Sequence, residues 1–281
     1  MTPYSKLNSQ GNDFILIEKH KIETKLTRDM IENYCSRDSI GCDQLFIIDT
    51  SDKSNIKCEV YNQDGSIACQ CGNGIRATML YLNKKYNLYN ANIIICNRPY
   101  HSKIKDDLIY IDMGMPNFMK CPCSEHISLS SDGIITSVDD KDSNINFSFI
   151  PLSIGNEHSV VFSPNCLKNK DLISKTLKKI FGYEMNIGFI ENAKEFLNNS
   201  ESIVKLTVNE RGAGYTESCG SGATAAAMCL FRLFELENKH EINNSNIKIQ
   251  QKGGILEVTK NHLNSFELIG PSSYDGDGYL E

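Results

Sequence analysis

The sequence lacks the long runs that mark membrane, secreted and nucleic-acid-binding proteins. No apolar segment approaches the roughly 18–20 residues that a membrane-spanning helix needs. The first residues lack a basic region followed by an apolar stretch, so we expect no secretory signal and a cytoplasmic location. Basic residues form only short runs such as Lys84-Lys85, and the net charge is −6. Because nucleic-acid binding usually needs a clustered basic surface, we expect a small-molecule substrate and no nucleic-acid or membrane partner.

The cysteines are plentiful, but their pattern does not suggest a disulfide framework. There are eleven, an odd number without a signal, which favours reduced thiols. A lone cysteine is usually a small buried hydrophobe, and this interpretation is given to Cys35, Cys42, Cys58, Cys96, Cys166 and Cys229. Cys69 and Cys71 could instead form a redox pair. Cys121-Pro122-Cys123 could be half of a metal site, although His126 stands alone and no second ligand pair has suitable spacing. We therefore predict no metal site; the absence of a cofactor is implied by the family resemblance described below.

One short string occurs twice in the 281 residues, a length typical of one large or two ordinary domains. Cys71-Gly72-Asn73-Gly74 returns as Cys219-Gly220-Ser221-Gly222. Two weaker matches have nearly the same separation: Gly11-Asn12 with Gly155-Asn156, and Ile40-Gly41 with Ile187-Gly188. Ordered matches at similar separations predict a duplicated architecture of two halves.

Apolar spacing predicts the same elements in each half. A helix is expected over Leu26–Cys35 and another over Leu172–Phe181. A second helix of each half begins at the repeated cysteine string and is apolar on more than one face, which predicts burial inside a sheet. Short strands are predicted at Phe14–Ile17, Ile56–Tyr61 and Ser159–Phe162. The fold class is therefore α+β, with each half a sheet around helices.

The seam between the halves is predicted at Met113–Asn117, where a proline lies among flexible positions. This places an N-terminal domain at residues 1–117 and a C-terminal domain at 118–263. The last segment, 264–281, has no counterpart in the first half, and we expect it to return there as a closing strand.

A cysteine placed just before a helix has a distinctive chemistry. Unpaired backbone N–H groups and the helix dipole lower its thiol pKa from about 8.5 toward neutrality. The same N–H groups can bind a carboxylate. Two such sites face to face could stabilise the charge that develops as an α-proton leaves, while one thiolate removes the proton and the other thiol returns one to the opposite face. A dinucleotide site is disfavoured, because Gly212-Ala213-Gly214 lacks the third glycine.

The chain resembles the diaminopimelate epimerase family along nearly its whole length. The resemblance is carried, in order, by the strings KLNSQGNDFILIE, GCDQLFII, YNQDGSIACQCGNGIRA, MGMPNF, SIGNEHSVVF, NIGFIE, NERGAGYTESCGSGATAAA and GGILEV. It implies two pseudo-symmetric domains, each a β-barrel-like mixed sheet wrapped around a central helix, with the active site between them. It also implies interconversion of LL- and meso-2,6-diaminopimelate without pyridoxal phosphate or metal, in lysine and peptidoglycan precursor synthesis. A homodimer is a further expectation.

The resemblance also implies roles for individual residues. Cys71 and Cys219 match the acid–base pair, and His158 and Glu210 match residues that tune it. Backbone N–H groups that hold the reacting carboxylate are matched by Gly72, Asn73, Gly220 and Ser221. Glu210 and Arg211 match contacts to the substrate's amino group and distal carboxylate. The distal amino-acid end and further substrate contacts are matched by Asn62, Asn156, Asn186, Asn12 and Gln44.

Two other functions stay open on the sequence. A related two-cysteine racemase could act on another amino acid, such as histidine or a diaminopimelate analogue. A non-catalytic ligand binder or thiol redox sensor could use the same scaffold. A substrate panel separates the first from a diaminopimelate epimerase, and exchange of the substrate α-hydrogen with solvent separates the second.

Overall fold

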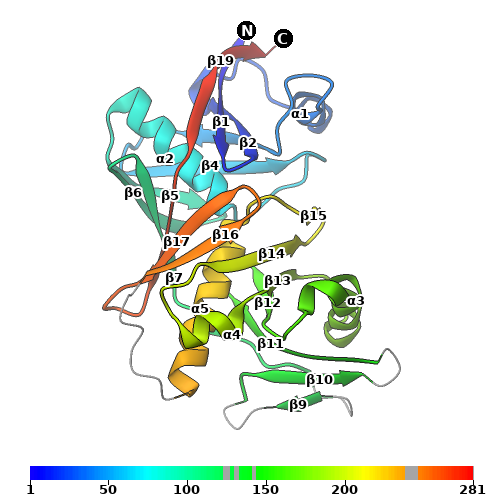
Figure 1. Ribbon diagram of the computed structural model, residues 1–281. Coiled ribbons are helices and arrows are strands. Elements are labelled where there is room, and N and C mark those ends of the chain that lie inside the picture. The colour runs from blue at the N-terminus through cyan, green and yellow to red at the C-terminus, as the bar shows by residue number, and fades with distance from the viewer. Residues whose placement is uncertain (123–126, 130–132, 141–143, 238–245, 281) are drawn as a thin grey trace. The chain divides into compact units, whose positions relative to one another are not determined.

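The computed structural model describes residues 1–122, 127–129, 133–140, 144–237 and 246–280 (Figure 1). Contacts between residues divide the chain into two compact units. Unit 1 comprises Met1–Asp112 and Ile269–Glu281, and unit 2 comprises Met113–Leu268. The predicted boundaries were residues 117 and 263. Among the described residues, no helix is long and apolar enough to cross a membrane.

Unit 1 is built on one mixed sheet. Its strands are β1 (Thr2–Ser9), β2 (Asn12–Glu18), β3 (Gln44–Asp49), β4 (Asn55–Asn62), β5 (Asn90–Ile95), β6 (Arg98–Lys105), β7 (Leu108–Gly114) and β19 (Ser273–Leu280). The spatial order is β19-β1-β2-β3-β4-β5-β6-β7. The pairs β2–β3 and β4–β5 are parallel, and the others are antiparallel. The C-terminal strand β19 therefore closes unit 1 by pairing with the first strand of the chain.

Two α-helices cover the two faces of the middle of this sheet. Helix α1 (Arg28–Cys35) packs Ile31, Tyr34 and Cys35 on Ile15, Ile17, Leu45 and Ile47. Because side chains alternate along a strand, Phe14, Leu16 and Phe46 point to the opposite face. That face carries α2 (Gly72–Tyr86), whose residues 72–82 are all buried. This two-sided covering explains why β2 is buried over Phe14–Glu18 without alternation.

A buried carboxylate anchors the far end of α2 to the sheet. Glu18, at the end of β2, accepts hydrogen bonds from Tyr81 Oη at 2.6 Å, Thr50 Oγ1 at 2.9 Å and Lys21 Nζ at 2.5 Å, and also from Tyr86 Oη. Burial raises the carboxyl pKa, but these donors outweigh it and lower the pKa of Glu18 to about 2. The charged carboxylate therefore ties the C-terminal part of α2 to the end of β2.

Unit 2 is also built on mixed β-sheet. Its strands are β8 (Asn117–Phe118), β9 (Ile127–Leu129), β10 (Thr136–Asp140), β11 (Ile145–Ser153), β12 (Glu157–Val161), β13 (Asn186–Ile190), β14 (Val204–Glu210), β15 (Gly214–Tyr215), β16 (Asn246–Gln251), β17 (Gly254–Lys260) and β18 (Phe266–Gly270), the last of which crosses the unit boundary. The main order is β9-β10-β11-β12-β13-β14-β16-β17, and β8 and β15 pair with β11 and β14.

The helices of unit 2 occupy the same kind of positions. Helix α3 (Lys170–Phe181) packs Ile173 and Leu177 on the apolar face that contains Phe149, Ile187 and Phe189. Helix α5 (Gly220–Leu236) is buried over almost its whole length and packs on β11–β14, β16 and β17 (Figure 1). Short helices complete the chain: α4 (Ala193–Asn198) in unit 2, and the 3-10 turns η1 (Lys19–Lys21) and η2 (Cys166–Asn169).

The two units share one topology, as the repeated strings predicted. In unit 1, β2 leads through α1 to the parallel strand β3, β4 is antiparallel to β3, and α2 leads to β5, parallel to β4. In unit 2, β12, α3, β13, β14, α5 and β16 repeat these relations. The predicted α+β class, with a buried helix beginning at each cysteine string, is confirmed.

The cysteine predictions were right at five positions and wrong at one. Cys35, Cys42, Cys58, Cys166 and Cys229 are buried as free thiols. Cys96 is exposed, and it forms a disulfide with Cys69. This corrects both the expectation of reduced thiols throughout and the idea of a Cys69–Cys71 redox pair. Sequence spacing could not show the pairing, because the fold brings the segment before α2 to the turn between β5 and β6. Cys121 is buried, whereas Cys123 and His126 lie outside the described residues.

The disulfide should stabilise the protein measurably. Cys69 and Cys96 are 27 residues apart and enclose all of α2. In the double variant Cys69→Ser/Cys96→Ser we expect the free energy of unfolding to fall by about 3 kcal/mol, because a loop of this length is no longer closed in the unfolded chain. Denaturant unfolding without reductant measures the difference. In dithiothreitol the wild type and the variant should unfold at the same denaturant concentration, and a difference that persists there would contradict this explanation.

Candidate active site

The predicted site residues gather at the same end of the sheet in each unit. In unit 1, Asn12 begins β2, Gln44 begins β3 and Asn62 ends β4. In unit 2, Asn156 precedes β12, Asn186 begins β13 and Glu210 ends β14. Because parallel strands start at one edge and an antiparallel neighbour ends there, the topology alone brings these polar side chains together. The central helix of each unit also begins at this edge.

The repeated cysteines cap their helices in the same way. Cys71 is the N-cap of α2, and its Sγ accepts a hydrogen bond from Gly74 N at 3.2 Å. Cys219 is the N-cap of α5, and its Sγ accepts from Gly222 N at 3.3 Å. Both residues have extended backbone, as N-caps usually do. Each thiol therefore lies at the positive end of a buried helix.

The glycine that ends each string is required by close packing. A Cβ built on Gly74 would lie 2.1 Å from Phe46 Cζ. A Cβ built on Gly222 would lie 2.8 Å from Val208 Cγ2 and 3.2 Å from Cys219 Sγ. The helix starts can press against their sheets only because these positions lack a side chain.

We define the Cys71 half-site as the predicted site residues of unit 1: Asn12, Gln44, Asn62, Cys71, Gly72 and Asn73. Asn73 Nδ2 donates to Asn12 Oδ1 at 3.4 Å, and Gln44 Nε2 donates to Asn62 Oδ1 at 2.9 Å. Gln44 Oε1 is buried without a hydrogen-bond partner among the described residues. A ligand ammonium or amide could supply that missing donor.

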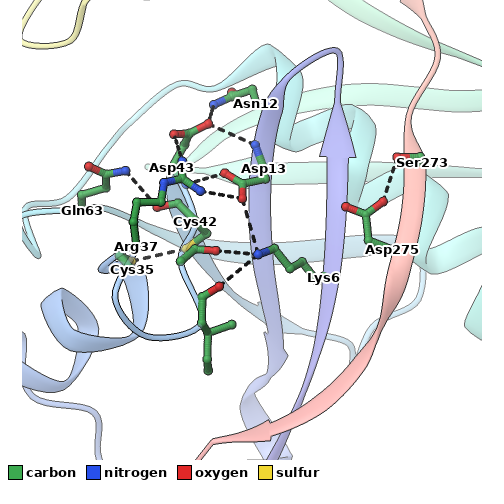
Figure 2. Close-up of polar contacts among 12 residues, drawn as sticks. Lys6, Asn12, Asp13, Cys35, Arg37, Cys42, Asp43, Gln63, Ser273 and Asp275 are labelled. Carbon is green, nitrogen blue, oxygen red and sulfur yellow. Dashed lines mark hydrogen bonds and ion pairs between the residues drawn. The ribbon is translucent and has the colours of Figure 1, made fainter.

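Asn12 is held by a charged cluster that sequence reasoning missed (Figure 2). Its Nδ2 donates to Asp43 Oδ2 at 2.5 Å, and Arg37 bonds Asp43 Oδ1 at 2.6 Å and Asp13 Oδ2 at 2.7 Å. Lys6 Nζ lies 3.6 Å from Asp13 Oδ2. Asp43 precedes Gln44 in the string GCDQLFII, so its position beside a predicted contact was the available signal. This cluster fixes which atoms Asn12 presents.

We define the Cys219 half-site as the predicted site residues of unit 2: Asn156, His158, Asn186, Glu210, Arg211, Cys219, Gly220 and Ser221. A chain of polar contacts joins three of them to the thiol. His158 Nε2 is 3.1 Å from Asn156 Oδ1, Asn156 Nδ2 donates to Ser221 Oγ at 3.2 Å, and Ser221 Oγ lies 3.5 Å from Cys219 Sγ. Burial lowers the pKa of His158 to about 3, so its imidazole is neutral. Because Nε2 faces a carbonyl oxygen, Nε2 carries the proton.

Asn186, Glu210 and Arg211 form the other side of this half-site. Asn186 Oδ1 accepts from Arg211 N at 3.0 Å, and Asn186 Nδ2 donates to Glu157 O at 3.2 Å. Both polar atoms of the Asn186 side chain thus form hydrogen bonds with backbone groups. Arg211 is exposed. Thr216 Oγ1 donates to Glu210 Oε1. Thr216 is a second contact that sequence reasoning missed, and it orients the Glu210 carboxylate.

The protonation of Cys219 differs from the prediction. Burial raises the pKa of its thiol, and the nearby Glu210 carboxylate raises it further. The hydroxyl of Ser221 and the N–H of Gly222 act in the opposite direction but do not compensate. The N–H groups and dipole of the helix start favour the thiolate, but the side chain is buried beside a negative charge. Cys219 therefore rests as a protonated thiol, which makes it a proton donor.

Comparisons with known proteins agree with this architecture. Among solved structures, a predicted epimerase from Pseudomonas aeruginosa superimposes with a TM-score of 0.67 at 12% identity, covering 100% of this chain and 99% of that one. A hydroxyproline epimerase from Agrobacterium vitis gives a TM-score of 0.65 at 8% identity, covering 99% and 91%. At such low identity these likenesses show the fold alone. It is the two-unit α+β fold found in epimerases and racemases.

Sequence relatives carry the assignment further. A protein named diaminopimelate epimerase from Buchnera aphidicola is 32% identical, covering 99% of this chain and 95% of the relative. One of the same name from Pelagibacter ubique is 28% identical, covering 95% and 94%. The protein is thus an isomerase of the epimerase and racemase class. The family model for diaminopimelate epimerase matches residues 4–119 and 151–274, and the chain belongs to that family.

Proposed function

We propose that the protein interconverts LL- and meso-2,6-diaminopimelate, with Cys71 and Cys219 as the two acid–base groups and without a cofactor. The observation that carries this proposal is the repeated cap: each unit places a cysteine thiol and the first N–H groups of a buried helix at one edge of its sheet. Membership of the family supports the choice of substrate. We place the reaction in lysine and peptidoglycan precursor synthesis, in the cytoplasm.

The reaction we propose moves one proton off the α-carbon and another onto it. The Cys71 thiolate takes the α-proton and becomes a thiol, while the electron pair spreads into the reacting carboxylate. The Cys219 thiol gives its proton to the opposite face of the carbon and becomes a thiolate. Backbone N–H groups of Gly72, Asn73, Gly220 and Ser221 would bind the carboxylate and stabilise its added negative charge. A cofactor that accepts the electron pair is then not required. In the reverse direction the thiols exchange roles.

Glu210 has two tasks in this proposal. Burial raises the thiol pKa of Cys219, and the Glu210 carboxylate raises it further, so that Cys219 is protonated in the free protein. When the substrate ammonium pairs with Glu210, the negative charge is neutralised and the Cys219 pKa falls. Binding therefore brings the thiol closer to the pKa of an acid–base catalyst that works in both directions. Asn12, Gln44, Asn62, Asn156, Asn186 and Arg211 would bind the remaining polar groups of a substrate that has an amino acid at each end.

A substrate panel tests the proposal. LL-diaminopimelate, L-histidine, L-proline and trans-4-hydroxy-L-proline are incubated with the protein under the same conditions, and stereoisomers are separated by chiral chromatography. We expect kcat/KM for diaminopimelate to exceed the others by about 10⁴-fold, because buried polar groups lose their partners when one amino-acid end is missing. Faster turnover of a one-ended amino acid would replace the substrate assignment. Absence of turnover and of α-hydrogen exchange with every compound would overturn the enzymatic function.

A further inference from the structure

Gln251 holds the main chain of Cys219 by both ends of its amide. Cys219 N donates to Gln251 Oε1 at 2.9 Å, and Gln251 Nε2 donates to Cys219 O at 3.2 Å. Gln251 is the last residue of β16, and it is 4% exposed. Both polar atoms of this buried side-chain amide are thus directed at the main chain of a single residue, one as acceptor and one as donor. This geometry points to a role in holding Cys219 itself.

The contact continues a strand-like pairing between two segments. Gly253 N donates to Glu217 O at 2.8 Å, and the exposed Lys252 and Glu217 form an ion pair. Two residues along from Glu217, the Gln251 amide pairs with both backbone groups of Cys219. This alternation reproduces the spacing of an antiparallel ladder, with a side-chain amide in place of a peptide group. The extended backbone of Cys219, with φ −128° and ψ 108°, is compatible with this pairing.

The position of the thiol depends on this backbone. Cys219 O also accepts the first helical hydrogen bond, from Ala223 N at 2.9 Å, and Cys219 Sγ accepts from Gly222 N at 3.3 Å. Rotation of the Cys219 main chain would therefore move the thiol relative to the helix start. Because Gln251 occupies Cys219 N, the N–H groups of Gly220 and Ser221 are the ones that stay available for an anion.

We propose that Gln251 is a positioning residue that fixes the reach of the Cys219 thiol toward the reacting carbon. The proposal rests on the function proposed above, in which Cys219 carries a proton to or from that carbon. Gln251 acts through Cys219 and does not touch substrate. A displacement of about 1 Å at a reacting group can cost about 100-fold in rate, so a lost positioning contact should appear mainly in kcat.

The test compares Gln251→Met, Gln251→Glu and the control Lys248→Met. The Met side chain has a similar length but no polar atoms, whereas Glu keeps an acceptor for Cys219 N. Lys248 lies on the same strand with an exposed side chain. We expect kcat for diaminopimelate to fall about 10- to 100-fold in Gln251→Met with little change in KM, and by less in Gln251→Glu. Lys248→Met should match the wild type. A kcat within about twofold of wild type in a folded Gln251→Met would overturn the proposal, because that is far below the cost of misplacement.

A second measurement distinguishes a local effect on the position of Cys219 from a general loss of packing in the protein. It does not require catalytic turnover. Iodoacetamide alkylation is followed by peptide mass mapping, so the rates and pH profiles of Cys219 and Cys71 are measured in the same molecule. In both Gln251 variants we expect the Cys219 profile to change while Cys71 is unaffected. Equal changes at both thiols, or no change at Cys219, would overturn the proposal. If the wild type fails to turn over diaminopimelate, the proposed function falls, and the alkylation contrast still decides the role of Gln251. If Gln251→Met does not fold, Gln251→Glu supplies both readouts.

Discussion

Alanine at either Cys71 or Cys219 is expected to reduce epimerisation of diaminopimelate by about 1000-fold or more, because each substitution removes one of the two proton-transferring groups. Neither thiol has a neighbour on the same helix start that could replace it: Gly72 and Gly220 carry no side chain, and the hydroxyl of Ser221 is far less acidic than a thiol. The measurement is kcat/KM for LL-diaminopimelate, with circular dichroism to verify folding.

Cys229→Ala is the matched control for these two variants. Cys229 is a buried free thiol on the same helix as Cys219. Its replacement removes one sulfur from the core but no acid–base group, so we expect activity near that of the wild type. If Cys71→Ala or Cys219→Ala retained turnover comparable to Cys229→Ala, the two thiols could not be the groups that exchange the α-proton.

Gly74→Ala should have the second largest effect, through packing rather than chemistry. The new Cβ would meet the ring of Phe46 at 2.1 Å, and Phe46 is fully buried against Phe14 with ring centroids 5.6 Å apart. The start of α2 must therefore shift, and Cys71 with it. We expect kcat to fall about 100-fold, as for other displacements near 1 Å, and the free energy of unfolding to fall by about 1–3 kcal/mol.

A second substitution tests whether overpacking is the cause. Phe46→Leu shortens the side chain that Gly74→Ala would strike, so the double variant should recover much of the lost kcat. Phe46→Leu alone should lower stability through the space it leaves but keep most of the activity. Additive losses in the double variant would show that Gly74 matters for a reason other than its contact with Phe46.

Much of this architecture follows from local patterns. The repeated cysteine string located both central helices to the residue, because an N-cap, a following glycine and an apolar run are local signals. Asn12 and Asn156 lie at equivalent positions, at the start of β2 and just before β12, because the two units repeat one topology. Because the sequence is duplicated, the elements found in one half predict those of the other half. The strand order that the two units share confirms this prediction.

What the sequence did not reveal depends on residues that are distant along the chain. The Cys69–Cys96 disulfide joins two exposed turns that become neighbours only through the β4–α2–β5 crossover. The raised pKa of Cys219 comes from burial and from Glu210, neither of which the helix-start motif describes. Gln251 is 32 residues from its partner Cys219 and has no motif of its own. Such contacts are set by tertiary packing, so spacing along the sequence cannot predict them.

The most direct test of the two-thiol mechanism is the fate of the α-hydrogen in deuterated water. The reaction is stopped when only a small fraction of the LL-diaminopimelate has been converted. Mass spectrometry then measures deuterium in the meso product and in the recovered substrate. Thiols exchange with solvent, so the thiol that protonates the carbon should deliver deuterium to the meso product, while unreacted LL-substrate stays unlabelled. A meso product that retains its original α-hydrogen, or deuterium that enters substrate and product equally, would contradict two opposed acid–base groups.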